Sequence, residues 1–343
     1  TLSLGLINAG VPITKLTYSS ITINGTSVSL GGSIDVGGGT SPITIENINS
    51  LFSTGLSGTG VGATSANNSN FFGEEAGYGA TVSYHTNFLG RRAGFEATGA
   101  GYSNFLGYSA GEDATGALAS NFLGNRAGFT AYDSNYSNFL GSSAGSSANN
   151  SEKSNFFGLN AGYGAFSADN SNFIGALAGD GSSGSARSIF IGSFTGYNQS
   201  NSTDSIFMGH YAGSSGYQGS GIALGINNII IGTNITLPVN VSNSINIGGI
   251  IYGTDSFYPA SSIDAPSSVP STNGKIGIGI TTPASKLSID GGVQIADDSD
   301  TASAAKVGTL KYREDANNSY TDMCMKTGAT VYAWVNIVTN TWV

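Results

Sequence analysis

Short apolar runs recur at a fixed spacing along the middle of the chain. The decapeptide SNFLGNRAGF (120–129) has near-copies on both sides, among them SNFLGYSAGE (103–112) and SNFLGSSAGS (137–146). The first glycine of each copy lies 17 residues after the one before it, from Gly73 to Gly209, without an insertion. Loops in ordinary globular repeats vary in length, so this strict period predicts that each unit is one coil of a parallel β-solenoid, or β-roll.

Within each unit, Asn-Phe-Leu-Gly is expected to form a short strand, and Ala-Gly-x-x-Ala a second extended run. Successive side chains of a strand point to opposite faces. The phenylalanines of the repeat therefore share one face: Phe71, Phe88, Phe105, Phe122, Phe139, Phe156, Phe173, Phe190 and Phe207. The next position is also apolar and points the other way: Phe72, Leu89, Leu106, Leu123, Leu140, Phe157, Ile174, Ile191 and Met208.

Two adjacent apolar positions in every copy predict that both faces of the strand are buried. A narrow coil can bury only its inner face, so the other face needs a cover. Soluble monomers rarely leave a long hydrophobic stripe open, and a rotation axis parallel to the stack would bury it in every subunit at once. The pattern therefore predicts an obligate homo-oligomer, and we expect a homotrimer.

Small and amide side chains keep the same register. An alanine follows each first glycine by three residues, with Thr195 as the exception, and suits a narrow interior. The glycines are expected at corners that need positive φ or close backbone approach. An asparagine before the phenylalanine predicts a hydrogen-bonded amide ladder: Asn70, Asn87, Asn104, Asn121, Asn138, Asn155 and Asn172. Ile189 and Ile206 replace it in the last two copies, which predicts drier coils there.

Composition agrees with an all-β chain that contains many tight turns. Of the 343 residues, 52 are glycine and only 10% are charged. The net charge of −9 comes without a basic stripe, so binding to nucleic acid through phosphates is not expected. No apolar run is long enough for a membrane-spanning helix. The single cysteine, Cys324, excludes an intrachain disulfide and is expected to be a buried hydrophobe.

The flanks of the repeat set the expected domain boundaries. VYAWVNIV (331–338) alternates as a strand does, and a Pro/Ser-rich stretch separates it from the repeat. The expected organisation is an N-terminal β-rich adaptor or shaft segment (1–50), a Gly/Ser loop (51–66), the solenoid (67–250, strictly periodic over 70–213 and irregular over 214–250), a linker (251–274) and a C-terminal β module (275–343).

The residue after each Ala-Gly pair is aromatic in five copies. An aromatic line on the outside of a rod could stack sugar rings, and its members are candidate glycan contacts: Tyr78, Phe95, Phe129, Tyr163 and Tyr197. The favoured alternative is that these rings pack against the neighbouring coil or subunit.

Acidic side chains offer a candidate calcium site. Asp297, Asp298 and Asp300 supply oxygen ligands of the kind that Ca²⁺ prefers, but the segment lacks the glycine turn and distal glutamate of a calcium loop. A polar turn that caps the next segment is the favoured interpretation.

Catalytic chemistry is not expected. Glu74–Glu75 and Glu112–Asp113 are paired carboxylates of the kind that a polysaccharide-cleaving β-helix would need, but they occupy variable positions and are expected to be solvated turn residues. His85 and His210 are too far apart in the repeat to share a metal. No threonine position is expected to recur, which disfavours an ice-binding ladder. We therefore expect no catalytic residues, no metal site and no cofactor.

The motif S-[NI]-F-[LI]-G-x-x-A-G resembles the head repeat of YadA-like trimeric adhesins over about residues 66–248. This resemblance implies a left-handed β-roll in which three chains share an apolar axis. LTYSSITINGTSVSLGGSIDV (16–36) resembles β segments of bacteriophage tail fibres and other virion structural proteins. KIGIGITTPASKLSIDGGVQI (275–295) resembles a linker near the distal ends of phage fibres and in some bacterial surface proteins.

The sequence thus predicts a non-enzymatic tail-fibre protein of a bacteriophage virion, extracellular and trimeric. Its expected partners are further copies of itself, other tail proteins and a bacterial surface glycan or protein receptor. A trimeric adhesin on the bacterial cell surface is the alternative, and a secreted carbohydrate-active β-helix enzyme is the third hypothesis.

Overall fold

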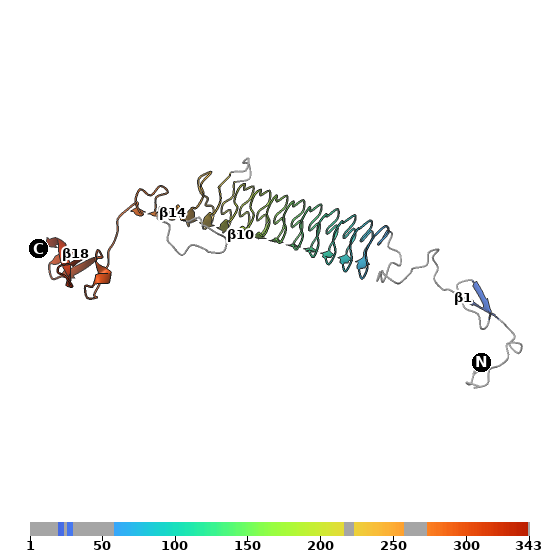
Figure 1. Cartoon of the computed structure of the whole chain (residues 1–343), viewed down its shortest axis with the longest axis horizontal. Helices are drawn as coiled ribbons and strands as arrows, with labels where there is room; N and C mark the ends of the chain where they lie inside the picture. The colour runs from blue at the N-terminus through green and yellow to red at the C-terminus, as the bar shows by residue number, and fades with distance from the viewer. Residues whose placement is uncertain (1–19, 24–25, 30–57, 216–222, 257–272, 342–343) are drawn as a thin grey trace, which may run out of the picture. The chain divides into compact units, whose positions relative to one another are not determined.

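A computed structural model describes residues 20–23, 26–29, 58–215, 223–256 and 273–341. The described residues form β-strands and tight turns, with one short 3₁₀-helix at Ala304–Lys306. The expected all-β class and the parallel β-solenoid are confirmed. Figure 1 shows the coils as a regular stack.

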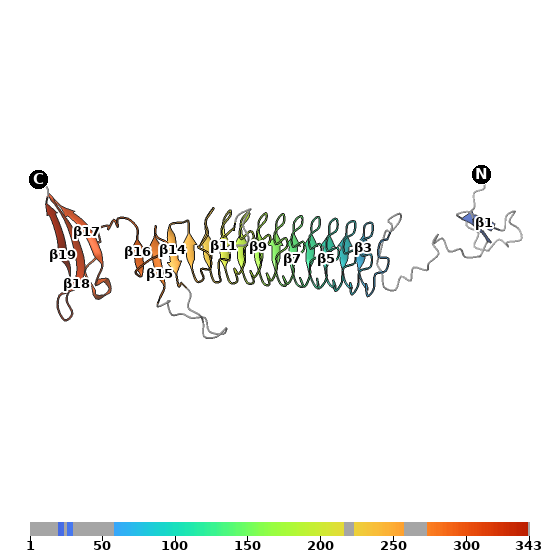
Figure 2. The same ribbon diagram turned by 90° about the horizontal axis from the view of Figure 1, so that it is seen from above.

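One fourteen-stranded sheet runs along the solenoid (Figure 2). Its first eleven strands are parallel and in register, each residue pairing with its counterpart one coil away. These strands are β3 (Asn70–Phe72), β4 (Asn87–Leu89), β5 (Asn104–Leu106), β6 (Asn121–Leu123), β7 (Asn138–Leu140), β8 (Asn155–Phe157), β9 (Asn172–Ile174), β10 (Ile189–Ile191), β11 (Ile206–Met208), β12 (Ile229–Ile231) and β13 (Ile245–Ile247).

The same sheet continues beyond the parallel coils through three more strands. β14 (Ile251–Thr254) pairs antiparallel with β13, β15 (Lys275–Ile278) antiparallel with β14, and β16 (Leu287–Ile289) parallel with β15. The sheet therefore includes the first residues of the expected linker and the start of the expected C-terminal module. Residues 257–272 of that linker lie outside the described residues.

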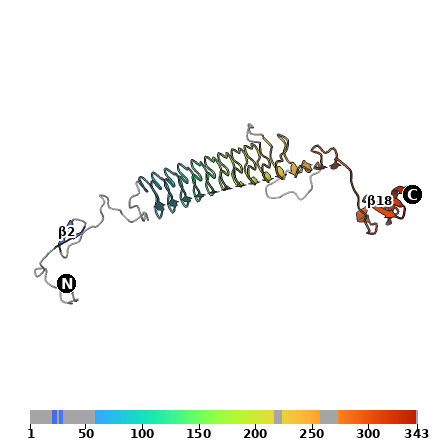
Figure 3. The same ribbon diagram turned by 180° about the vertical axis from the view of Figure 1, so that it is seen from behind.

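The remainder of each coil consists of tight turns, so the expectation of a second extended run is wrong. In the unit that follows β4, Gly94 has φ 63° and Glu96 has φ 51°, and such left-handed residues interrupt an extended chain. Pairing on this side is limited to single bridges, one in each coil. Figure 3 shows the narrow coils from behind.

Four threonines in consecutive coils occupy this bridge position: Thr64, Thr81, Thr98 and Thr115. Thr81 Oγ1 donates a hydrogen bond to Thr98 Oγ1 at 3.3 Å. The expectation that no threonine position recurs is therefore wrong. The column changes to Tyr132 in the next coil, so the threonine ladder covers only the first coils.

The interior of the solenoid contains a continuous stack of phenylalanine rings. From Phe71 to Phe207 the rings of neighbouring coils lie parallel, with centroids 4.7–5.2 Å apart. Alanines fill the rest of the core. Gly128, at φ 62°, lies against the ring of Phe122 at a distance that leaves no room for a Cβ atom. The glycine after each alanine thus combines a left-handed corner with close contact to the ring.

A column of buried serines joins each coil to the next. Ser137 Oγ donates to the carbonyl of Ser151 at 2.8 Å and accepts from the backbone N–H of Ser154 at 3.1 Å. Equivalent pairs recur along the column. These hydroxyls satisfy backbone groups at a corner where no strand pairing is available.

The described residues also form a two-stranded and a three-stranded sheet. The hairpin of β1 (Ser20–Ile23) and β2 (Thr26–Ser29) falls in the expected N-terminal segment. β17 (Leu310–Asp315), β18 (Asn318–Lys326) and β19 (Tyr332–Thr341) form an antiparallel sheet, which confirms the strand expected over 331–338. Cys324 is fully buried in β18, as expected.

Candidate functional site

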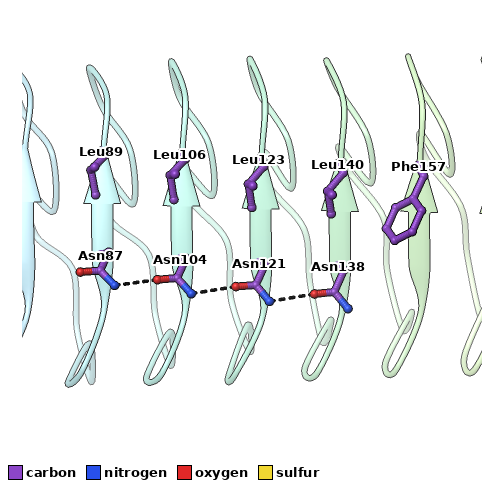
Figure 4. A pocket seen from close by; sticks show the side chains of 9 residues that line it. All are labelled: Asn87, Leu89, Asn104, Leu106, Asn121, Leu123, Asn138, Leu140 and Phe157. Carbon is purple, nitrogen blue, oxygen red and sulfur yellow. Dashed lines mark hydrogen bonds between the residues drawn. The ribbon is translucent and has the colours of Figure 1, made fainter.

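The outer face of the fourteen-stranded sheet, turned away from the phenylalanine stack, is the candidate functional surface. In β4 to β8, asparagine and aliphatic or aromatic side chains point outward from the two ends of each strand (Figure 4). They line a shallow depression of about 600 Å³. Hereafter, the outer face means the side chains that precede and follow the central residue of each strand in this sheet.

The asparagines of the outer face form the expected amide ladder. The side-chain Nδ2 of each donates to the Oδ1 of the next, from Asn70 to Asn172, over six bonds of 2.6–2.8 Å. Figure 4 shows three of these bonds between Asn87 and Asn138. Each amide has two N–H donors and an oxygen with two lone pairs. The ladder uses one donor and one lone pair of each interior member and leaves one donor and one lone pair of each amide outside it.

The second column of the outer face is apolar on all fourteen strands; we call it the apolar stripe. It contains the side chains predicted from the repeat, and Phe72 and Leu89 are 53% and 39% exposed. The stripe continues across the reversed strands, because Ile247 pairs with Ile251, and Ile251 with Ile278. The stripe is therefore longer than the parallel part of the sheet and continues where the strand direction changes.

The first column changes character at one point. It is asparagine through β9, then aliphatic from Ile189 in β10. In the strands that follow it is Ile206, Ile229, Ile245, Gly253, Ile276 and Leu287. The outer face is therefore half amide and half apolar in its N-terminal part, and almost wholly apolar in its C-terminal part. It carries no charged side chain in either column.

The candidate glycan contacts are largely occupied by their own neighbours. The rings of Tyr78 and Phe95 stack on each other at 5.1 Å. The Arg92 guanidinium lies 4.2 Å from the Phe95 ring centroid, and Arg126 lies at the same distance from Phe129. For Tyr78, Phe95 and Phe129, these contacts favour the interpretation that the rings pack against neighbouring coils over the interpretation that they stack on sugars. Tyr163 is 43% exposed, and Tyr197 lies beside the Phe194 ring.

The paired carboxylates form ion pairs across the coils. Glu74 accepts from Arg91 at 2.9 Å, whereas Arg92 lies between Glu75, at 3.4 Å, and Glu112, at 2.8 Å. The expectation that Glu112 is a solvated turn residue is wrong, because its side chain is only 5% exposed. Glu112 occupies the position that Phe95 and Phe129 hold in the adjacent coils, and its carboxylate contacts Arg92.

Asp180 occupies the equivalent position between Tyr163 and Tyr197. Burial raises the pKa of its carboxyl from the ordinary value of 3.8 to about 6, because desolvation disfavours the charged form. The pKa of the Asp180 carboxyl thus lies closer to neutral pH than that of an ordinary aspartate.

The candidate calcium ligands contact a lysine. Lys306 Nζ lies 2.6 Å from an oxygen of Asp298 and 2.8 Å from an oxygen of Asp300. The Lys306 hydrogen bond and the Asp300 backbone N–H lower the pKa of Asp298. This arrangement is a polar turn, and Asp297 has no place in its ion pairs. Over the whole described part of the chain, no three His, Cys, Asp or Glu side chains gather so that they could hold a metal.

His85 and His210 are not brought together. His85 stacks on Tyr102 at 5.2 Å, and His210 lies against Tyr211 at 4.4 Å near the other end of the solenoid. In the segments that the structure describes, no helix has the length and apolar character needed to cross a bilayer.

Sequence reasoning missed two parts of this arrangement. The serine column was visible as the first letter of the repeat motif, but the backbone groups that it satisfies are 14 and 17 residues away. The extension of the apolar stripe into β14–β16 was visible as Ile-x-Ile alternation in KIGI (275–278). The reversal of strand direction hid its continuity with the repeat.

No protein-family model, curated protein or solved structure matches this chain. The outer face offers a long, uncharged surface with a fixed axial repeat, which is suited to association with another regular surface.

Proposed function

We propose that this chain is a non-enzymatic structural fibre protein of a bacteriophage virion, which associates as a homotrimer and projects a stiff rod from the tail for attachment to the host surface. The observation that carries the proposal is the apolar stripe, which runs unbroken across all fourteen strands of the sheet, both the eleven parallel, in-register strands and the three that follow them.

The construction of the coils supports a mechanical role. Every coil from β3 to β13 is hydrogen-bonded to the next through its strand, and the buried serines and the ring stack add further links. Bending such a stack would separate these contacts together on one side of the axis, so the solenoid resists bending. Three identical rods joined in parallel would also present three copies of any weak receptor contact and raise avidity.

The outer face supports association of identical chains. An exposed stripe of this length is costly in water, because burial of apolar area contributes about 25 cal/mol per Å². A three-fold axis parallel to the stack would place the stripe of every copy in the same protected environment. The lack of charge on both columns is consistent with a buried interface.

The proposed partners are two further copies of the chain, other tail proteins, and a glycan or protein receptor on the bacterial surface. The proposed location is the virion tail, outside the cell. A trimeric adhesin on a bacterial surface is the second candidate, favoured by the same repeat and the same face. A carbohydrate-active enzyme has less support, because Glu74, Glu75 and Glu112 contact arginines instead of opening into a shared groove.

Two measurements test the proposal. Light scattering on the purified chain, with and without mild SDS, should give three times the 34.7 kDa mass of the chain. A monomer would contradict the fibre model. Electron microscopy with an antibody to this chain should then label phage tails. Label on the bacterial envelope instead would replace the phage assignment with the adhesin.

A further inference from the structure

The outer face contains one marker of position along an otherwise uniform repeat. The apolar stripe is similar at every coil, so two copies that slide past each other by a whole coil would make nearly the same contacts. The first column differs, because it changes from Asn172 to Ile189 between β9 and β10. This change from amide to aliphatic, which we call the boundary, occurs at a single place in the sheet.

We infer that copies of this chain associate through the outer face in parallel, and that the boundary between Asn172 and Ile189 sets their axial register. The inference rests on the proposed function, since it needs the proposed association. It adds which way the copies run and what stops them from slipping.

The repeat spacing identifies a second copy as the occupant of the face. Neighbouring phenylalanine rings, one coil apart, step by 4.7–4.8 Å through most of the stack. A partner that meets the apolar stripe at every coil must repeat at the same step, and this chain does so by construction. The partner must also lack charge along its contact, which holds for both columns of the outer face.

The amide ladder makes a mismatch at the boundary energetically unfavourable. Each interior asparagine uses one N–H and one lone pair within its own ladder, so the remaining amide donor and acceptor require water or a partner. Against the asparagine column of a second copy, these groups can be satisfied. Against an aliphatic column they would be buried without a partner, which is unfavourable.

Slippage and reversal are both penalised by this arrangement. Sliding one copy by one coil places an asparagine opposite an isoleucine, and each further coil adds another mismatch. An antiparallel arrangement would place the amide half of one copy against the apolar half of the other. A single polar position in a coiled coil fixes register by the same physical principle.

Disulfide trapping tests the register. Asn121→Cys and Asn155→Cys occupy the first column two coils apart, which is about 9.5 Å along the axis. That separation exceeds the limit of about 7 Å between Cα atoms for a disulfide. The two variants, with different tags, are co-expressed, oxidised and separated without reductant. The unmodified chain, whose Cys324 is buried, serves as the blank.

In parallel, in-register assemblies, 121–121 and 155–155 disulfides should exceed 121–155 disulfides at least tenfold. A trimer with equal amounts of all three, or with none, would overturn the proposed register while leaving the fibre proposal intact. A monomeric mass by light scattering would contradict both the proposed register and the fibre proposal. The two proposals therefore fail in distinguishable ways.

Moving the boundary tests its role directly. Ile189→Asn with Ile206→Asn extends the amide column by two coils. If these changes are placed in the Asn155→Cys copy, aligning the two boundaries brings position 155 opposite position 121 of the unmodified-boundary copy. The 121–155 disulfide should then appear. In the matched control, the same two changes are placed in the Asn121→Cys copy, and this disulfide should stay absent. Failure of the first pair to cross-link would overturn the boundary as the register device.

Discussion

Two separate requirements favour glycine at particular positions of this fold: a left-handed backbone and a lack of space for a Cβ atom. Gly128 has φ 62° and lies against the Phe122 ring, whereas Gly164 has φ 60° and has no atom near the place of a Cβ. The two positions share backbone strain and differ in steric contact, so they form a matched pair.

Gly128→Ala should lower the free energy of unfolding by about 1–3 kcal/mol more than Gly164→Ala, because only the first overpacks the core. Gly164→Ala should cost about 1–2 kcal/mol from its left-handed backbone alone. Urea unfolding of both variants measures the difference. Equal losses would mean that the glycine after each alanine is needed for its backbone only.

Asp180 should make the stability of the solenoid depend on pH. Its pKa is about 6 in the folded chain, above the ordinary 3.8, so the folded state binds this proton more tightly than the unfolded state. The stabilising effect of the protonated carboxyl is present below about pH 4 and is lost as the pH rises through about 6.

Asp180→Asn should therefore raise the thermal midpoint at pH 7–8 and leave it nearly unchanged at pH 4. Melting curves of the variant and the parent chain across this range measure the effect. Asp113→Asn, at an exposed position in another coil, is the matched control for replacement of an aspartate. An Asp180→Asn curve parallel to that of the parent chain would contradict the raised pKa.

A single coil depends on the buried serine that links it to the next. Ser137→Ala should cost about 2 kcal/mol or more, because it leaves the Ser151 carbonyl and the Ser154 N–H buried without a partner. Ser142→Ala, at an exposed position of the same coil, should change stability by less than about 0.5 kcal/mol. Chemical denaturation of both compares the two sites, and a near-neutral Ser137→Ala would show that other groups satisfy this corner.

Coils in such a stack depend chiefly on their neighbours. A defect at Ser137 should therefore weaken the coils of β7 and β8 first. Amide hydrogen exchange of the variant should show the largest loss of protection there, and a uniform loss along the solenoid would indicate a more cooperative unit.

Association of whole chains should depend on the apolar stripe rather than on exposed apolar residues in general. Leu106→Lys with Leu123→Lys places two charges on the outer face and should reduce the native mass from that of the proposed trimer to that of a monomer. Tyr136→Lys is the control: Tyr136 is 54% exposed and belongs to neither column of this face, and Lys153 occupies the equivalent place in the next coil. Light scattering compares the three chains. A trimer that survives the double leucine variant would exclude the stripe as the interface.

The 17-residue period, the column of phenylalanines on one face of the strands, the small interior residues and the amide ladder could all be predicted from the sequence. In a solenoid, residues one period apart become neighbours, so a linear repeat translates directly into a column of contacts. Phe122 and Asn121 therefore needed no information beyond their spacing. The all-β class followed from the same regularity.

The backbone conformation and the burial of the residues between the strands could be determined only from the tertiary structure. Left-handed residues such as Glu96 turn the chain at corners that local patterning suggested were extended. Glu112 is buried although it occupies a variable position of the repeat, and Ser137 bonds to groups 14 and 17 residues ahead. Such outcomes depend on which unlike residues meet across coils and on where strand direction reverses. A repeat fixes the spacing of contacts, but the burial of a variable side chain depends on neighbours that only the assembled coils bring together.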